Sequence, residues 1–157
     1  MSRLWLPKAL AETMRAEARA AHPAECCGLL IGTGDPSAAD GARVEEVVPA
    51  ANLEASHRQD RFEIDPAIRL AVMRRLGQLD GDSGARAERS LRGPRLLGHY
   101  HSHPAGAAEP SETDRQRAEE SGLVWLIIGA EGHLGAWLAE PDEAGRPSFR
   151  RLTLRLG

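Results

Sequence analysis

Apolar residues recur at intervals of three and four after Pro7, which predicts an amphipathic helix over roughly residues 7–21. Asp65 and Pro66 are a favourable cap and first residue, and the same apolar spacing behind them predicts a second helix to about residue 80. A third helix is expected to begin at Ser111 and to end near residue 121.

Short apolar runs between these helices predict strands. The run at residues 27–32 is continuous and closes with glycine, which is typical of a strand buried on both faces. Further strands are expected at residues 43–49, 61–64, 95–102, 123–129, 133–139 and 149–156. Helices interleaved with both adjacent and separated strands favour an α/β fold with a mixed sheet.

The length of 157 residues suits a single domain, 1–157, and is too short for two ordinary ones. A formal net charge of −3 gives no electrostatic reason to expect nucleic-acid binding. The longest apolar run, residues 123–129, is far too short to cross a membrane, and the N-terminus lacks a signal-peptide core. We therefore expect a cytoplasmic protein without a nucleic-acid or membrane partner.

The only two cysteines, Cys26 and Cys27, are adjacent. Neighbouring Cα atoms are about 3.8 Å apart, which is shorter than ordinary disulfide geometry allows. The pair is also not the Cys-x-x-Cys arrangement of redox or zinc sites. We expect both side chains to act as small apolar residues on a buried strand.

The pattern with the clearest chemistry is His101-x-His103, followed eleven residues later by Asp114. Two histidines at i and i+2 of an extended segment point to the same side, so both rings can reach one metal ion. Asp114 would lie on the first turn of the helix that begins near Ser111. Two histidines and one carboxylate leave a fourth tetrahedral position for water, as in catalytic zinc sites, although iron or manganese would also accept these ligands.

Two residues near this pattern have more than one interpretation. Ser111 and Asp114 have the spacing of a helix capping box, and capping can coexist with a role in the site. A metal-activated water needs a group that takes its proton and delivers it to the leaving group. Glu25, just before the apolar run at 27–32, is the best candidate for that group, although locally it could also be a solvated loop acid.

Four segments, in order along the chain, closely resemble the JAMM (MPN+, Mov34) metalloprotease family in its compact prokaryotic branch. They are residues 23–32 (PAECCGLLIG), 61–65 (RFEID), 98–104 (GHYHSHP) and 110–114 (PSETD). The resemblance covers essentially the whole chain. It implies an MPN-type domain whose mixed, mostly antiparallel β-sheet is partly barrel-like and flanked by helices, with a layering similar to that of cytidine deaminases.

The same resemblance implies the roles of the site residues. His101, His103 and Asp114 match the zinc ligands of the family, with one Zn²⁺ per chain. Glu25 matches the catalytic glutamate. Ser111 matches the serine that helps to hold the activated water and the developing oxyanion.

The resemblance further implies a zinc-dependent peptidase or isopeptidase that hydrolyses an amide bond at the C-terminal tail of a ubiquitin-like protein. Compact bacterial relatives trim sulfur-carrier proteins, whose extended tail ends in Gly-Gly. One helix fills the interval from Asp114 to residue 123, which leaves no room for the insertion that clamps a second ubiquitin in eukaryotic relatives. A phage-tail or cell-wall JAMM peptidase and a non-catalytic MPN scaffold stay open as alternatives, as do the carrier's identity and the oligomeric state.

Two features lie beside this pattern. His99 occupies a position where the family usually has an apolar or aromatic residue, and we expect a packed or partly exposed histidine there rather than a third histidine ligand. Residues 80–93 are rich in Gly, Ser, Arg and Ala, which is typical of a surface loop. This loop is predicted to form a flap over the incoming tail.

Overall fold

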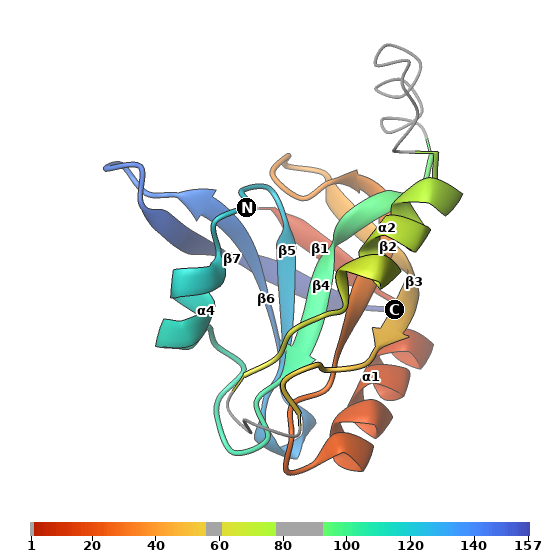
Figure 1. The fold of residues 1–157 in the computed structure, drawn as a ribbon. Helices are drawn as coiled ribbons and strands as arrows, with labels where there is room; N and C mark the ends of the chain where they lie inside the picture. The colour runs from red at the N-terminus through yellow and green to blue at the C-terminus, as the bar shows by residue number, and fades with distance from the viewer. Residues whose placement is uncertain (1, 56–60, 78–92) are drawn as a thin grey trace.

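Seven strands close into a barrel in the computed structural model, in the order β1-β3-β2-β4-β5-β6-β7 (Figure 1). The structure describes residues 2–55, 61–77 and 93–157. The described elements, in chain order, are β1 (Arg3–Leu6), α1 (Lys8–Ala21), β2 (Cys27–Asp35), β3 (Gly41–Ala50), α2 (Pro66–Arg75), β4 (Arg95–Ser102), α4 (Glu112–Arg117), β5 (Val124–Ile128), the short 3₁₀ helix η1 (Ala130–Gly132), β6 (Leu134–Pro141) and β7 (Pro147–Leu156).

Most neighbouring strands of the barrel run antiparallel. This holds for β2 with β3 and β4, and for β6 with β5 and β7, whereas β1–β3, β1–β7 and β4–β5 are parallel. The predicted mixed, mostly antiparallel sheet with flanking helices is therefore confirmed.

Alternation along the strands divides the apolar residues between the two faces of the sheet. Leu30, Tyr100 and Leu126 join one core cluster with Leu10 and Met14 of α1. Residues of the other face pack in two separate clusters, one beneath α2 and one beside α4. Figure 1 shows these two helices on opposite sides of β4.

The hydrophobic pattern did not predict β1, and the strand predicted at residues 61–64 is wrong. Strand β1 has only four residues, of which Leu4 and Leu6 are fully buried or nearly so, and a pattern this short gives no usable periodicity. Residues 61–64 form no strand, only an isolated bridge between Ile64 and Asn52. The Asn52 side chain takes the backbone hydrogen bonds there that a neighbouring strand would have made.

Two helix ends also differ from the prediction. Helix α4 ends at Arg117 instead of near residue 121, because Ala118 packs into the cluster beside α4 and the Gly122 amide donates to the Ala139 carbonyl, which directs the chain into β5. Helix α2 ends at Arg75 and is followed by Gly77 with φ of 72°. The predicted flap at residues 80–93 lies outside the described residues, except for Gly93.

Among the helices that the structure describes, none has the length and apolar character needed to cross a membrane.

Candidate metal centre

The end of β4 sends alternate side chains to opposite faces of the sheet. Tyr100 and Ser102 face α1, where the Tyr100 hydroxyl donates to the Glu17 carboxylate at 2.8 Å and the Ser102 hydroxyl accepts from the Cys26 amide at 2.8 Å. A Cβ at Gly28 would lie 2.4 Å from the Tyr100 ring, so glycine allows this close packing of β2 against β4. These contacts fix the strand end that carries His101 on the other face.

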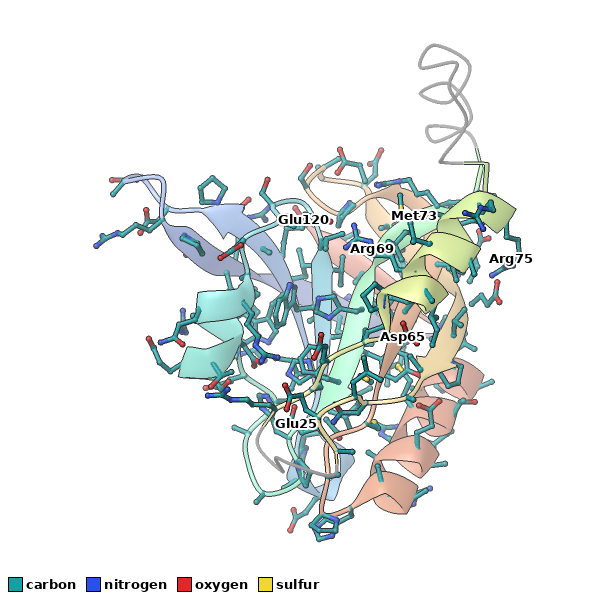
Figure 2. The ribbon with its side chains drawn as sticks, in the orientation of Figure 1. Glu25, Asp65, Arg69, Met73, Arg75 and Glu120 are labelled. Atoms are coloured by element: carbon teal, nitrogen blue, oxygen red, sulfur yellow. The ribbon has the colours of Figure 1, made fainter. Side chains whose placement is uncertain are left out.

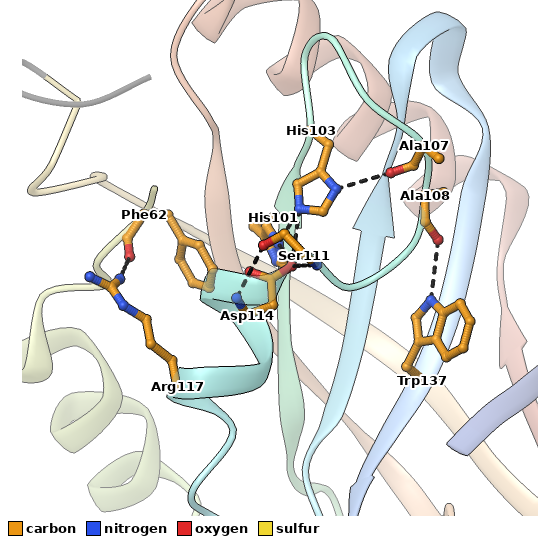
Figure 3. A network of polar contacts seen from close by, with 9 residues as sticks. All are labelled: Phe62, His101, His103, Ala107, Ala108, Ser111, Asp114, Arg117 and Trp137. Atoms are coloured by element: carbon orange, nitrogen blue, oxygen red, sulfur yellow. Dashed lines mark hydrogen bonds and ion pairs between the residues drawn. The ribbon is translucent and has the colours of Figure 1, made fainter. Parts of the chain in front are cut away.

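Three ligand-type atoms converge beyond that strand end (Figure 3). His101 Nε2 lies 3.0 Å from His103 Nε2, and Asp114 Oδ2 lies 3.2 and 3.1 Å from these two nitrogens. Four ligands placed tetrahedrally at the usual zinc bond lengths would be about 3.3 Å apart. The observed triangle therefore has the size that a divalent metal ion requires.

The hydrogen bond of the second His103 nitrogen supports this arrangement. His103 Nδ1 lies 3.0 Å from the Ala107 carbonyl, which can only accept, so Nδ1 carries the hydrogen and the lone pair of Nε2 faces the site. The next carbonyl, of Ala108, accepts from Trp137 Nε1 at 3.2 Å. A Cβ at Gly135 would lie 2.2 Å from that same carbonyl oxygen, so glycine lets the loop approach the barrel.

Asp114 is oriented by the capping box that the sequence suggested. Its Oδ2 accepts from the Ser111 amide at 2.9 Å, and the Ser111 hydroxyl accepts from the Asp114 amide at 3.1 Å. The same carboxylate oxygen points at both histidines. The capping interpretation of Ser111 and Asp114 is therefore confirmed, and the cap aims the carboxylate into the site.

The three groups hold their protons differently. Burial of His101, which has no exposed surface, lowers its pKa. Burial opposes protonation of His103 too, but the contact with Asp114 outweighs it and raises the pKa of His103. Burial alone would raise the pKa of Asp114, whereas its contacts with the two histidines and the Ser111 amide hold it well below its usual range. Near neutral pH, His101 is therefore uncharged and Asp114 ionised, which are the forms that bind a cation.

The ring of His101 is held by stacking. Phe62 lies over it with ring centroids 4.2 Å apart and planes inclined by 17°. The Phe62 carbonyl accepts from Arg117 Nη1 at 2.5 Å, which joins this segment to α4 (Figure 3). In the described part of the chain, His101 Nδ1 is buried without a hydrogen-bond partner. Aromatic stacking therefore replaces the hydrogen bond that usually orients a metal-binding histidine.

Glu25 lies beside the two histidines. A carboxylate oxygen of Glu25 is within 4.8 Å of a ring nitrogen of each, and Glu25 is only 5% exposed. The structure thus brings all five predicted site residues to one end of β4, and Glu25 is buried rather than a solvated loop acid.

Sequence reasoning missed Asn52, which positions this acid. Its amide nitrogen donates to the Glu25 carbonyl at 2.9 Å and to the Arg61 carbonyl at 3.1 Å. Its oxygen accepts from the Glu63 amide at 2.9 Å, so one side chain joins the Glu25 segment to the segment that carries Phe62. Asn52 is the only asparagine in the sequence, which was the one available signal.

The remaining histidine and cysteine candidates lie apart from the triangle. His99 packs edge-on against Trp125 with ring centroids 4.3 Å apart, and burial lowers its pKa to about 3, so its ring is neutral. Cys26 and Cys27 are buried free thiols, as expected. Burial raises the pKa of Cys27 to about 12, which makes it a poor nucleophile.

A family model described as prokaryotic homologs of the JAB domain matches residues 7–145. The chain belongs to this family. Among curated relatives, the JAB-family chain is 31% identical over 132 residues to a desampylase of Haloferax volcanii, covering 84% of this chain and 78% of the relative. It is 32% identical over 119 residues to a CysO-cysteine peptidase of Mycobacterium tuberculosis, covering 76% and 68%.

The fold of this chain is also found among solved structures. A protein from Desulfitobacterium hafniense with 30% sequence identity superposes with a TM-score of 0.71, covering 98% of this chain and 92% of that one. The family is one of metalloproteases, which agrees with the group of Glu25, His101 and His103 as residues that could hold a metal ion.

Proposed function

We propose that this JAB domain is a zinc-dependent peptidase or isopeptidase that cleaves an amide bond at the C-terminal tail of a ubiquitin-like protein of the sulfur-carrier type. The observation that carries the proposal is the triangle of His101 Nε2, His103 Nε2 and Asp114 Oδ2, with edges of 3.0 to 3.2 Å and the Glu25 carboxylate beside it. In this account the three atoms hold one Zn²⁺ per chain.

When bound, zinc polarises the scissile carbonyl and lowers the pKa of a water molecule to about 7. Glu25 takes the proton of the attacking water and passes it to the leaving amine. Glu25 is only 5% exposed and lies beside the two histidines, so bulk water has little access to compete for that proton. The Ser111 hydroxyl, whose oxygen accepts from the helix amide, is free to donate to the developing oxyanion.

The substrate assignment draws on the relatives. One is named a desampylase and another a CysO-cysteine peptidase. Within this chain, six-residue α4 and a short turn fill the space between Asp114 and β5, which supports a compact enzyme without a clamp for a second ubiquitin-like protein. We expect the substrate to present an extended tail that ends in Gly-Gly.

A fluorogenic peptide with an aminocoumarin amide after Gly-Gly tests this function. We expect the zinc-loaded protein to release the fluorophore, and excess chelator to abolish the release. Because a peptide lacks the globular carrier, the assay is repeated with a ubiquitin-fold carrier extended by one amino acid, read by mass spectrometry. Cleavage of a cell-wall peptide alone would favour the phage-type alternative, and turnover of no substrate would favour a scaffold.

Replacing Ser111 by alanine should reduce kcat by roughly 10²–10³-fold, because one oxyanion donor is lost. The zinc content should stay at that of the wild type. Alanine also removes the cap of α4, which costs about 1 kcal/mol of stability, so Ser111→Thr serves as the control that keeps both the hydroxyl and the cap. Equal activity of the alanine and threonine variants would contradict a role in turnover.

Zinc affinity should fall as the pH is lowered, and protonation of His103 should determine this dependence. The metal-free pKa of His103 is raised above 6.5, so protons compete for Nε2 already above that pH, and a metal needs the neutral ring. His101 and Asp114 have lowered pKa values and add no proton competition near neutrality. We expect the affinity to fall about tenfold per pH unit below the His103 pKa, measured against a chelator calibrated at each pH. A two-proton dependence would contradict this assignment.

A further inference from the structure

A groove of about 480 Å³ lies on the outer face of the barrel, next to the metal centre. Its floor is formed by Leu29, His99 and Trp125, which are direct register partners on β2, β4 and β5. Pro66 at the start of α2 lines one side and Arg117 of α4 lines the other. The site is concave and mainly apolar with a few polar groups, which is the usual character of a ligand pocket.

Arg69, one of the residues that line the groove, makes an ion pair. Arg69 of α2 donates to Glu120, which follows α4, at 2.6 Å. Figure 2 shows these two side chains side by side, with Glu25 labelled lower in the view. Phe62 also lines the groove and stacks on His101, so the groove adjoins the metal centre.

The spacing of residues along β4 relates the groove to the metal centre. His99 is two residues before His101 on the same face of β4, a separation of about 7 Å along an extended chain. The Phe62 ring lies between the two, with centroids 5.6 Å from His99 and 4.2 Å from His101. A substrate tail extended beside β4 advances by the same distance per residue. If the scissile carbonyl belongs to the last glycine and lies at the metal centre, the residue two positions earlier in the tail reaches the groove.

The floor of the groove offers one polar group among aromatic rings. Within the described ranges, neither nitrogen of the His99 ring makes a hydrogen bond, and Nδ1 is buried. Phe62 and Trp125 flank the ring at 5.6 and 4.3 Å. Aromatic neighbours favour an aromatic guest, and the neutral imidazole can accept or donate one hydrogen bond. A purely apolar guest would leave that polar group unpaired in a dry site.

We propose that this groove is a specificity pocket for a tyrosine side chain, carried by the residue before the Gly-Gly end of the substrate tail, with its hydroxyl hydrogen-bonded to His99. The proposal rests on the proposed function for the direction of the tail. It makes His99 a specificity-determining residue for the tail sequence. Glycines at the last two tail positions pass the Phe62 ring, and the first side chain of the tail enters the pocket.

Binding to the metal-free protein tests this pocket independently of catalysis. Two peptides that differ only in Tyr or Phe before a C-terminal Gly-Gly are titrated calorimetrically into chelator-treated protein. We expect the tyrosine peptide to bind roughly three- to tenfold more tightly, the range of one neutral hydrogen bond. His99→Leu and His99→Phe should both remove the preference. His133→Leu, at a histidine whose side chain is 78% exposed, should keep it.

Equal affinities for the two peptides in the wild type, absence of binding, or a preference that survives in both His99 variants would overturn the pocket. The outcome for the proposed function is separate. If the wild type prefers tyrosine but the zinc-loaded protein cleaves neither the aminocoumarin derivative of this peptide nor an extended carrier, the hydrolase proposal fails and the pocket stands. If cleavage occurs but the wild type shows no preference for tyrosine, the hydrolase proposal stands and the pocket proposal fails.

Discussion

Glu25→Gln should lower kcat/KM for a Gly-Gly tail substrate by about 10²–10⁴-fold, the usual contribution of a positioned general acid–base. Glutamine keeps the size of the side chain and its polar oxygen but cannot take a proton from water. Because Glu25 is buried and its backbone carbonyl is held by Asn52, the substitution should leave the segment in place. The loss should appear in kcat, with zinc content and melting temperature close to the wild type.

The control for this variant is Glu109→Gln, an exposed glutamate on the loop between His103 and Ser111. It makes the same chemical change close to the site without touching the proposed proton-transfer group, and its activity should match the wild type. Retention of more than about a tenth of the activity by Glu25→Gln would assign proton transfer to another residue.

Asp114→Ala should abolish zinc binding. The substitution removes one of three protein ligands and leaves two histidines, so the affinity should fall by more than about a hundredfold, beyond the effect of losing an outer-sphere partner. It also leaves the Ser111 amide without its carboxylate acceptor and removes half of the capping box of α4. Zinc per chain after dialysis, measured by plasma mass spectrometry, gives the result directly.

Asp65→Ala separates loss of a helix cap from loss of a ligand. Asp65 caps α2 by accepting from the Ala67 amide at 2.9 Å, so its removal should cost about 1 kcal/mol of stability and no zinc. If Asp114→Ala bound zinc as tightly as Asp65→Ala, the carboxylate would have only a capping role.

Much of the fold followed from periodicity, because burial of one face imposes a repeat on each long element. Helix α1 and strands β2 and β4 were predicted within a few residues. What periodicity could not supply is the partner of each strand. Closure of the barrel depends on four-residue β1 pairing with both β3 and β7, and nothing in a short local pattern specifies two distant partners.

The metal-facing residues could be proposed because their spacing along one strand and one helix start is set by local geometry. His101 and His103 share a face at i and i+2, and the capping box turns Asp114 back towards them. Phe62 and Asn52 could not be assigned in this way. Their roles come from a segment without regular structure, and only the folded chain brings it against His101 and Glu25.

His99 illustrates the same limit of local pattern. Its spacing from His101 fits a ligand as well as a packed ring, and the sequence alone offers no neighbours to decide between them. In the structure its ring faces Trp125 and lines the outer groove, beneath Phe62, while the three-atom triangle is complete without it. The environment of a ring, rather than its spacing, separates the two functions.

Zinc K-edge X-ray absorption of the protein loaded with one equivalent of zinc identifies the atoms that bind the ion. We expect only nitrogen and oxygen neighbours at about 2.0–2.2 Å, with the multiple-scattering pattern of two imidazoles. A sulfur shell near 2.3 Å would place the ion on Cys26 or Cys27 and contradict the account. Zinc that dialyses away from the wild type before measurement would contradict it equally.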